Sequence, residues 1–87
     1  MKKVQWRFEA LDASANGTGR NYNCTTIIFE NRTGGSDIIL INNTWTLYPG
    51  WLPLYLKCLP GEIDINNYQF VFVNPSTSTS ILQIAYK

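Results

Sequence analysis

The stretch LYPGWLPLYLKCLPGEI, residues 47–63, decides how we expect this chain to fold. Two Pro-Gly pairs, Pro49-Gly50 and Pro60-Gly61, bracket the run 51–59. Proline presets φ at the first central position of a type II turn, and glycine supplies the positive φ that the second position needs. The run between the pairs is therefore predicted to be a strand with a chain reversal at each end.

The two faces of this predicted strand differ from those of an ordinary surface strand. One face carries Leu52, Leu54, Leu56 and Cys58, and the other carries Trp51, Pro53, Tyr55 and Lys57. A solvated strand face should be polar, so the aromatic second face suggests that something covers it. Because Pro53 cannot donate to a ladder, the strand is expected to lie at a sheet edge or to carry a bulge.

Short apolar runs separated by turn residues make up the rest of the chain. Strands are predicted over residues 4–11, 22–30, 37–41, 44–48, 68–73 and 81–87. The run 27–29 is apolar on both faces, which indicates a central strand, and 68–73 is predicted to be the most buried. No run shows helical spacing beyond two turns. The sequence therefore predicts an all-β chain, a small antiparallel β-sandwich or barrel of seven to eight short strands.

Several local patterns give more detailed expectations. Strict alternation at the start places Val4, Trp6, Phe8 and Ala10 on one, apolar side. Asn16-Gly17 suits a type I′ hairpin, and Asn42-Asn43 tolerates the left-handed φ values of a tight hairpin. In the connection 62–67, Ile63 and Ile65 are expected to point inward while Asp64 faces water.

Length and charge limit the classes of function. A chain of 87 residues makes one domain, 1–87, with no second core. Its net charge of +1 gives no broad field for nucleic acid or an anionic membrane, so neither is expected as a partner. No stretch approaches the roughly 18 apolar residues of a membrane span. Polar residues interrupt any apolar region after Lys2-Lys3, so we expect no signal peptide and synthesis in a cytoplasm.

The two cysteines, Cys24 and Cys58, allow one intrachain disulfide at most. Without a secretion signal, two reduced and mostly buried thiols are favoured over a disulfide. Their separation fits no zinc spacing and the chain has no histidine, so no metal or cofactor is expected. Asn-x-Ser/Thr acceptors are expected to be turn residues rather than glycosylation sites; they begin at Asn16, Asn23, Asn31 and Asn42.

Catalysis is poorly supported by the residue types present. The chain has no histidine for acid-base work near neutral pH. Glu62 and Asp64 would share one side of an extended segment, but nothing nearby in the sequence would raise either pKa. Gly34-Gly35 lacks the lysine of a phosphate-binding loop. We therefore expect no enzyme and no catalytic residue.

Aromatic residues are the richest feature, and four of them, Trp45, Tyr48, Trp51 and Tyr55, cluster within eleven positions. Such rings can pack in a core, fill a subunit or partner interface, or stack on sugars beside Asn and Asp side chains. Nucleic-acid stacking would need a basic groove, and only Lys57 is close in sequence. The four aromatic residues and Lys57 are thus the candidates for an interface or a glycan-stacking site.

From Ile27 onward, the order of elements resembles that of small accessory proteins of tailed-bacteriophage virions. An apolar strand and an Asn/Gly turn precede TWTLYPG (44–50), PGEIDINNYQFVFV (60–73) and a last apolar strand. This resemblance implies a β-sandwich that decorates a capsid or builds part of a head fibre or tail, usually as a homo-oligomer. It also implies phage capsid or tail proteins as partners and the virion as the final location.

Two function classes follow as expectations. The first is a non-catalytic structural virion protein that acts through an oligomeric or capsid-docking interface. The alternative is a carbohydrate-binding or receptor-binding module in which Trp45, Tyr48 and Trp51 stack on glycans. A phage-encoded inhibitor of a host protein is a third possibility.

Overall fold

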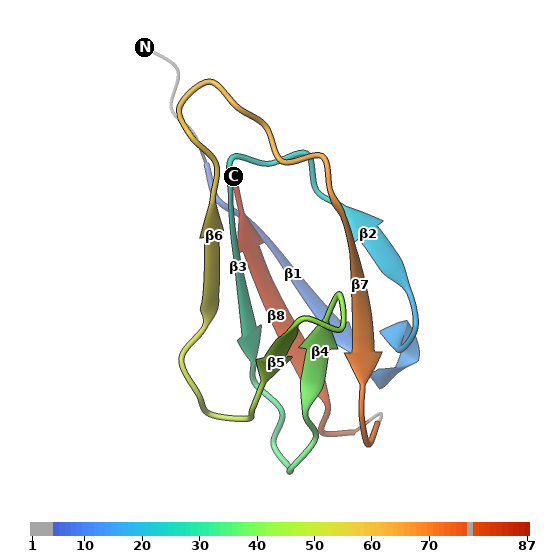
Figure 1. The fold of residues 1–87 in the computed structure, drawn as a ribbon. Coiled ribbons are helices and arrows are strands. Elements are labelled where there is room, and N and C mark those ends of the chain that lie inside the picture. Colours follow the sequence, from blue (N-terminus) through green and yellow to red (C-terminus); the bar gives the residue numbers. More distant parts are fainter. Residues whose placement is uncertain (1–4, 77) are drawn as a thin grey trace.

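The computed structural model describes residues 5–76 and 78–87. Within these residues the chain forms eight strands in two antiparallel sheets that pack face to face as a sandwich (Figure 1). The strands are β1 (Arg7–Asp12), β2 (Gly19–Asn21), β3 (Thr26–Asn31), β4 (Ile39–Ile41), β5 (Trp45–Leu47), β6 (Leu54–Lys57), β7 (Asn67–Phe72) and β8 (Ile81–Tyr86). One 3₁₀ turn, η1 (Ala13–Ala15), follows β1.

Sheet A has the strand order β1-β8-β3-β6 and sheet B has the order β2-β7-β4-β5. Because each sheet has two outer strands with no further neighbour among the described strands, the architecture is an open sandwich and not a closed barrel. The predicted all-β fold is therefore confirmed, and the sandwich is the correct one of the two architectures.

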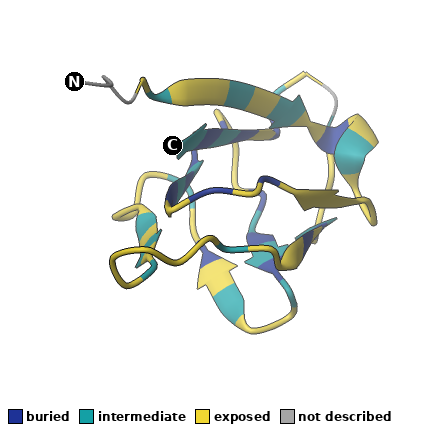
Figure 2. Ribbon diagram, turned by 90° about the horizontal axis from the view of Figure 1, so that it is seen from above, coloured by how far each residue is buried: buried dark blue, intermediate teal, exposed yellow. Residues whose placement is uncertain are grey.

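The core lies between the two sheets, and the buried positions of the chain are dark blue in Figure 2. It consists of the inward-facing rings and aliphatic side chains of both sheets. Phe29 of β3 packs against Tyr68 and Phe70 of β7, with ring centroids 5.1 and 6.0 Å apart. Leu82 and Ile84 of β8 are fully buried beside them. These contacts join sheet A to sheet B, and the burial of such apolar side chains stabilises the fold.

Both predicted Pro-Gly turns form as expected. Gly50 has φ +75° and the Trp51 N–H donates to the Tyr48 carbonyl at 3.2 Å. Gly61 has φ +85° and the Glu62 N–H donates to the Leu59 carbonyl at 3.0 Å. These values are those of type II turns. The strand between them is shorter than predicted, since β6 covers only Leu54–Lys57, but it lies at the edge of sheet A as Pro53 indicated.

Asparagine shapes two other turns. Asn42 and Asn43 have φ +54° and +51° in the β4–β5 hairpin, which confirms the left-handed conformations expected there. Asn16 instead has φ −57° and ψ 127° and is followed by Gly17 at φ +79°, so this turn is type II and not type I′. The Asn16 side chain explains the difference, because its Oδ1 accepts the Phe72 N–H at 2.9 Å and ties the turn to β7.

The inward face of β1 was predicted wrongly. Phe8 is 70% exposed and Ala10 is exposed, whereas Glu9 and Leu11 are half-buried. Leu11 pairs with the buried Leu82 and must share its inward direction. Glu9 is accommodated on that side because it accepts hydrogen bonds from Tyr22 Oη at 2.9 Å and from Arg20 at 3.2 Å. Val4 lies outside the described residues.

The orientation of the segment 62–67 was also predicted wrongly. Ile63 and Ile65 are 61% and 72% exposed, while Asp64 is half-buried. Asp64 exchanges two backbone hydrogen bonds with Cys24, at 2.7 and 3.3 Å, and this bridge fixes which side chains turn inward. The carboxylate then accepts a hydrogen bond from Tyr68 Oη.

The second predicted strand, 22–30, is divided in the structure. Asn23 adopts φ +46°, Cys24 forms an isolated bridge, and β3 begins only at Thr26. This strand lies between β8 and β6, so its predicted central position is confirmed. It is also more buried than β7, which leaves Asn67 and Gln69 exposed. The prediction that residues 68–73 form the most buried strand was therefore wrong.

Candidate interaction surface

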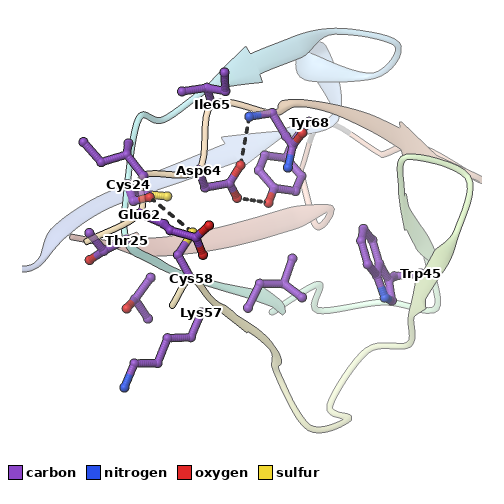
Figure 3. A pocket seen from close by; sticks show the side chains of 13 residues that line it. Cys24, Thr25, Trp45, Lys57, Cys58, Glu62, Asp64, Ile65 and Tyr68 are labelled. Atoms are coloured by element: carbon purple, nitrogen blue, oxygen red, sulfur yellow. Dashed lines mark hydrogen bonds between the residues drawn. The ribbon is translucent and has the colours of Figure 1, made fainter. Parts of the chain in front are cut away.

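The five candidate residues do not gather at one place. Trp45 lies on β5 in sheet B, where it is half-buried and packs against the core. It also lines a pocket near Tyr68, on the inner side of the sandwich (Figure 3). Trp45 is therefore separated from the other four candidates, and it is the only one of the five whose ring serves mainly to pack against the core.

Tyr48 and Trp51 form a ring pair on the connection between β5 and β6. They occupy the first and last positions of the Pro49-Gly50 turn, which brings their rings to a centroid distance of 4.7 Å and an interplanar angle of 38°. Trp51 is 67% exposed, and Tyr48 is also exposed. The type II turn thus holds two large rings in place at the surface.

Tyr55 and Lys57 project from the outer face of β6. Their neighbours Leu54 and Leu56 turn inward and pack against the core, as the predicted alternation requires. Tyr55 is 56% exposed, so the outer face of this strand carries an uncovered ring. Among the described residues, no carboxylate lies within ion-pair distance of Lys57.

Two exposed leucines extend this apolar region and were not foreseen. Leu52 is 90% exposed, although the alternation placed it on the same face as Leu54 and Leu56; it precedes β6 and does not share the strand's pleat. Leu59, just past the other end of β6, is 71% exposed. Their position beside the two Pro-Gly turns was the sequence signal, because a reversal tends to expose its flanking residues.

We call the exposed apolar residues on β6 and its two flanking connections the β6 surface: Tyr48, Trp51, Leu52, Tyr55 and Leu59. Large apolar residues scattered singly over a protein are ordinary. Five of them within twelve consecutive positions, with Lys57 as the one charged side chain among them, are typical of an interaction site.

A pocket of about 410 Å³ opens beneath the β6–β7 connection and contains both thiols (Figure 3). Cys24 and Cys58 are free, and Cys58 Sγ lies 4.0 Å from the Cys24 carbonyl. Burial, and to a lesser extent the nearby Asp64, raises the pKa of Cys24 to about 11 and also raises the pKa of Cys58. Both thiols are therefore protonated and weakly nucleophilic near neutral pH.

The carboxylates near this pocket have structural partners. Glu62 Oε1 accepts the Leu59 N–H at 3.2 Å, within the turn that Gly61 forms. Asp64 bonds to Tyr68, and burial together with this hydrogen bond raises the pKa of the tyrosine above its ordinary value. In residues 5–76 and 78–87, no group of three or more cysteine and carboxylate side chains is placed to hold a metal ion.

A second pocket, of about 450 Å³, brings together residues from distant parts of the sequence. Trp6, Tyr22 and Tyr86 line it, with the Tyr22 and Tyr86 rings 4.8 Å apart. Lys87 Nζ lies 4.6 Å from the centre of the Trp6 ring. Sequence reasoning missed this site because no local pattern joins these positions.

Comparisons with known proteins give no relative. The chain matches no protein-family model, and neither the curated proteins nor the solved structures contain a significant match. In the described part of the chain, no helix has the length and hydropathy needed to cross a bilayer.

Proposed function

We propose that this protein is a non-catalytic structural component that docks onto other protein subunits through the β6 surface. The observation that carries the proposal is the exposure of Trp51 and Tyr55, at 67% and 56%. Tyrosine and tryptophan are enriched in protein interfaces, where they supply large contact areas at a low entropic cost. Had both rings been packed into the core, nothing would support a docking role.

The order of elements supports a virion as the setting. The resemblance to accessory proteins of tailed-phage virions rests on the segment from Ile27 onward, which contains all but the first residue of β3, the strands β4 to β8 and the whole β6 surface. A small sandwich with few charges and one apolar surface suits a decoration or head/tail protein, whose role is to bind neighbouring subunits. Capsid or tail proteins are the proposed partners.

The test is incorporation of variants into particles. Trp51→Ser with Tyr55→Ser removes the two most exposed rings of the β6 surface and should leave folding intact, because neither ring is buried. Phe8→Ser is the matched control: it removes an aromatic ring that is 70% exposed on β1, at the opposite edge of sheet A.

We expect the double variant to fold normally and to be lost from purified particles, while Phe8→Ser is retained at the wild-type copy number. Retention of the double variant at that copy number would refute the docking role of the β6 surface.

Carbohydrate binding is the second candidate, and the Tyr48–Trp51 ring pair is the observation in its favour. Both rings are exposed and held together by the turn, so their outer faces are open to a sugar ring. Trp45 takes no part, because it lies against the core on β5. Binding to a glycan array that is lost in Trp51→Ser would support this candidate, and no binding on a broad array would refute it.

A further inference from the structure

The free edge of β6 indicates what kind of partner the β6 surface fits. This strand is the outermost member of sheet A, with β3 on one side and, among residues 5–76 and 78–87, no strand on the other (Figure 1). An uncovered edge strand presents unpaired backbone groups that can extend the sheet with a strand from another chain.

The ladder with β3 shows which backbone groups are free. In its register Thr26 faces Lys57 and Ile27 faces Leu56, and just beyond it the Cys58 N–H donates to the Thr25 carbonyl at 2.9 Å. Because bonded and non-bonded pairs alternate in an antiparallel ladder, Leu54 and Leu56 bond to β3. The N–H and C=O groups of Tyr55 and Lys57 therefore point away from sheet A.

We propose that a second copy of this chain adds its β6 antiparallel to this edge, with Tyr55 opposite the partner's Lys57. The result is a continuous eight-stranded sheet with a two-fold axis at Leu56. This inference rests on the proposed docking role of the β6 surface and names the occupant of that surface.

Three registers would align the free groups of two β6 strands, and only one suits both chains. Pairing Tyr55 with itself places Lys57 opposite Pro53, which has no N–H, so the Lys57 carbonyl lacks a donor. Pairing Lys57 with itself sets two ammonium groups side by side, and like charges directly opposite are destabilising.

The register centred on Leu56 avoids both defects. Tyr55 and Lys57 exchange two hydrogen bonds with their counterparts at each end, which makes four in all. Paired residues share a face, so each Lys57 lies beside the partner's Tyr55 ring, where a cation–π contact stabilises the dimer. This complementarity of β6 with itself favours a second copy over an unrelated strand.

The exposed leucines fit the same arrangement. Continuing the register beyond the strands brings Leu59 next to the partner's Pro53 and Leu52 next to the partner's Pro60. The side chains of the β6 surface expose on the order of 600 Å² per chain, against roughly 800 Å² per partner in a standard interface. Exposed apolar area is therefore already present on and beside the strand at which the second copy pairs.

Sedimentation velocity on purified protein at about 0.1 mM tests the inference, because a micromolar dimer would be fully formed there. We expect the wild type, a chain of 9.9 kDa, to sediment as a dimer. Lys57→Pro should convert it to a monomer while the fold is retained, since the lost N–H is not used in the ladder with β3.

Thr46→Pro is the matched control for this proline. Thr46 is the exposed middle residue of β5, the outer strand of sheet B. Across the β4–β7 pair, the Asn42 N–H bonds to Gln69 and the Val73 N–H bonds to Ile38. The alternate β4 residues, Ile39 and Ile41, therefore bond to β5, where they face Leu47 and Trp45. Thr46 lies between these two bonded residues, so its N–H points away from β4. This variant should remain a dimer.

A charge exchange tests the register without proline. Tyr55→Lys places a lysine opposite the partner's Lys57 and should raise the dimer dissociation constant at least tenfold. Adding Lys57→Glu to it creates an opposite-charge pair and should restore dimerisation.

The inference would be overturned if the wild type were a monomer. It would also be overturned if the dimer dissociation constant were unchanged by Lys57→Pro and by both charge variants. A monomer whose Trp51→Ser, Tyr55→Ser form is still lost from particles would leave the proposed docking function standing and remove only the second copy as its occupant.

Discussion

Replacing Asp37 with alanine should remove a large part of the stability of this fold. Asp37 is 3% exposed; its Oδ1 accepts the Asn74 N–H at 2.6 Å and its Oδ2 accepts the hydroxyl of the fully buried Ser80 at 2.7 Å. Hydrogen bonds to a charged group are worth about 1.5–3 kcal/mol each, so losing two of them costs roughly 3–6 kcal/mol. The total free energy of unfolding of an 87-residue domain is about 4–13 kcal/mol.

Urea denaturation followed by tryptophan fluorescence measures this loss. With a slope of about 1 kcal/mol per molar urea, the midpoint should fall by roughly 3 M or more, and part of the Asp37→Ala protein should be unfolded without denaturant. Asp37→Asn keeps the shape and one acceptor, so its cost should be clearly smaller.

Asp12→Ala serves as the control for Asp37→Ala. Asp12 is an exposed residue that accepts hydrogen bonds from Ser14 before η1, and losing such a cap costs about 1 kcal/mol. If Asp37→Ala shifts the midpoint no more than Asp12→Ala, the hydrogen bonds of Asp37 to Asn74 and Ser80 do not stabilise the fold as argued, and the reasoning fails.

Three further predictions concern the turns and the titrating groups. Gly61→Ala places a Cβ at φ +85° in open space, so backbone strain alone should destabilise the fold by about 1–2 kcal/mol in the same urea assay; no shift would refute the turn's conformation. Because burial raises the pKa of Cys24 to about 11, iodoacetamide at pH 8 should modify it about a hundredfold more slowly than in the urea-unfolded chain, and equal rates would show that the thiol is not buried. Burial and hydrogen bonds to carboxylates raise the pKa of Tyr22 and of Tyr68 above the ordinary value of 10. As the pH rises, these tyrosines ionise in the unfolded chain before they ionise in the folded one. Their contribution to the free energy of unfolding is therefore complete below pH 10 and is lost as the pH rises above it. Two of the five tyrosines should then resist ionisation until the protein unfolds in a phenolate absorbance titration, whereas simultaneous ionisation of all five would contradict the burial.

The features predicted correctly from the sequence are those that a few neighbouring residues determine. Proline and glycine fix the two type II turns, and the asparagines at 42 and 43 adopt left-handed φ in their hairpin, because these preferences belong to the residues themselves. The edge position of β6 follows in the same way from Pro53. Such features need no knowledge of the other sheet.

The errors lie where contacts from distant parts of the chain decide the orientation. Glu9 turns inward because Tyr22 bonds to it, and Asp64 turns inward because Cys24 and Tyr68 do. In both segments the apolar neighbours are consequently left outside, against the alternation rule. A polar residue with a tertiary partner can reverse the face of a short strand, and hydrophobic periodicity contains no sign of that partner.

The candidate site was predicted in part for the same reasons. Local alternation placed Trp51 and Tyr55 on one face of the strand but left open whether that face turns inward, and both rings are exposed in the structure. Trp45 was grouped with them by its nearness in sequence, but the β4–β5 pairing places it in the other sheet. The pocket lined by Trp6, Tyr22 and Tyr86 had no sequence signal, because its residues meet only after folding.

The place of β8 in sheet A has a consequence for how the protein is made. Of the eight strands, β8 is the last to leave the ribosome, yet it lies between β1, the first, and β3. Until residues 81–86 emerge, β1 has no neighbour, and β3 has only β6. Nascent chains are therefore expected to wait with β1 unpaired and one edge of β3 open, and to complete sheet A late, in one concerted step.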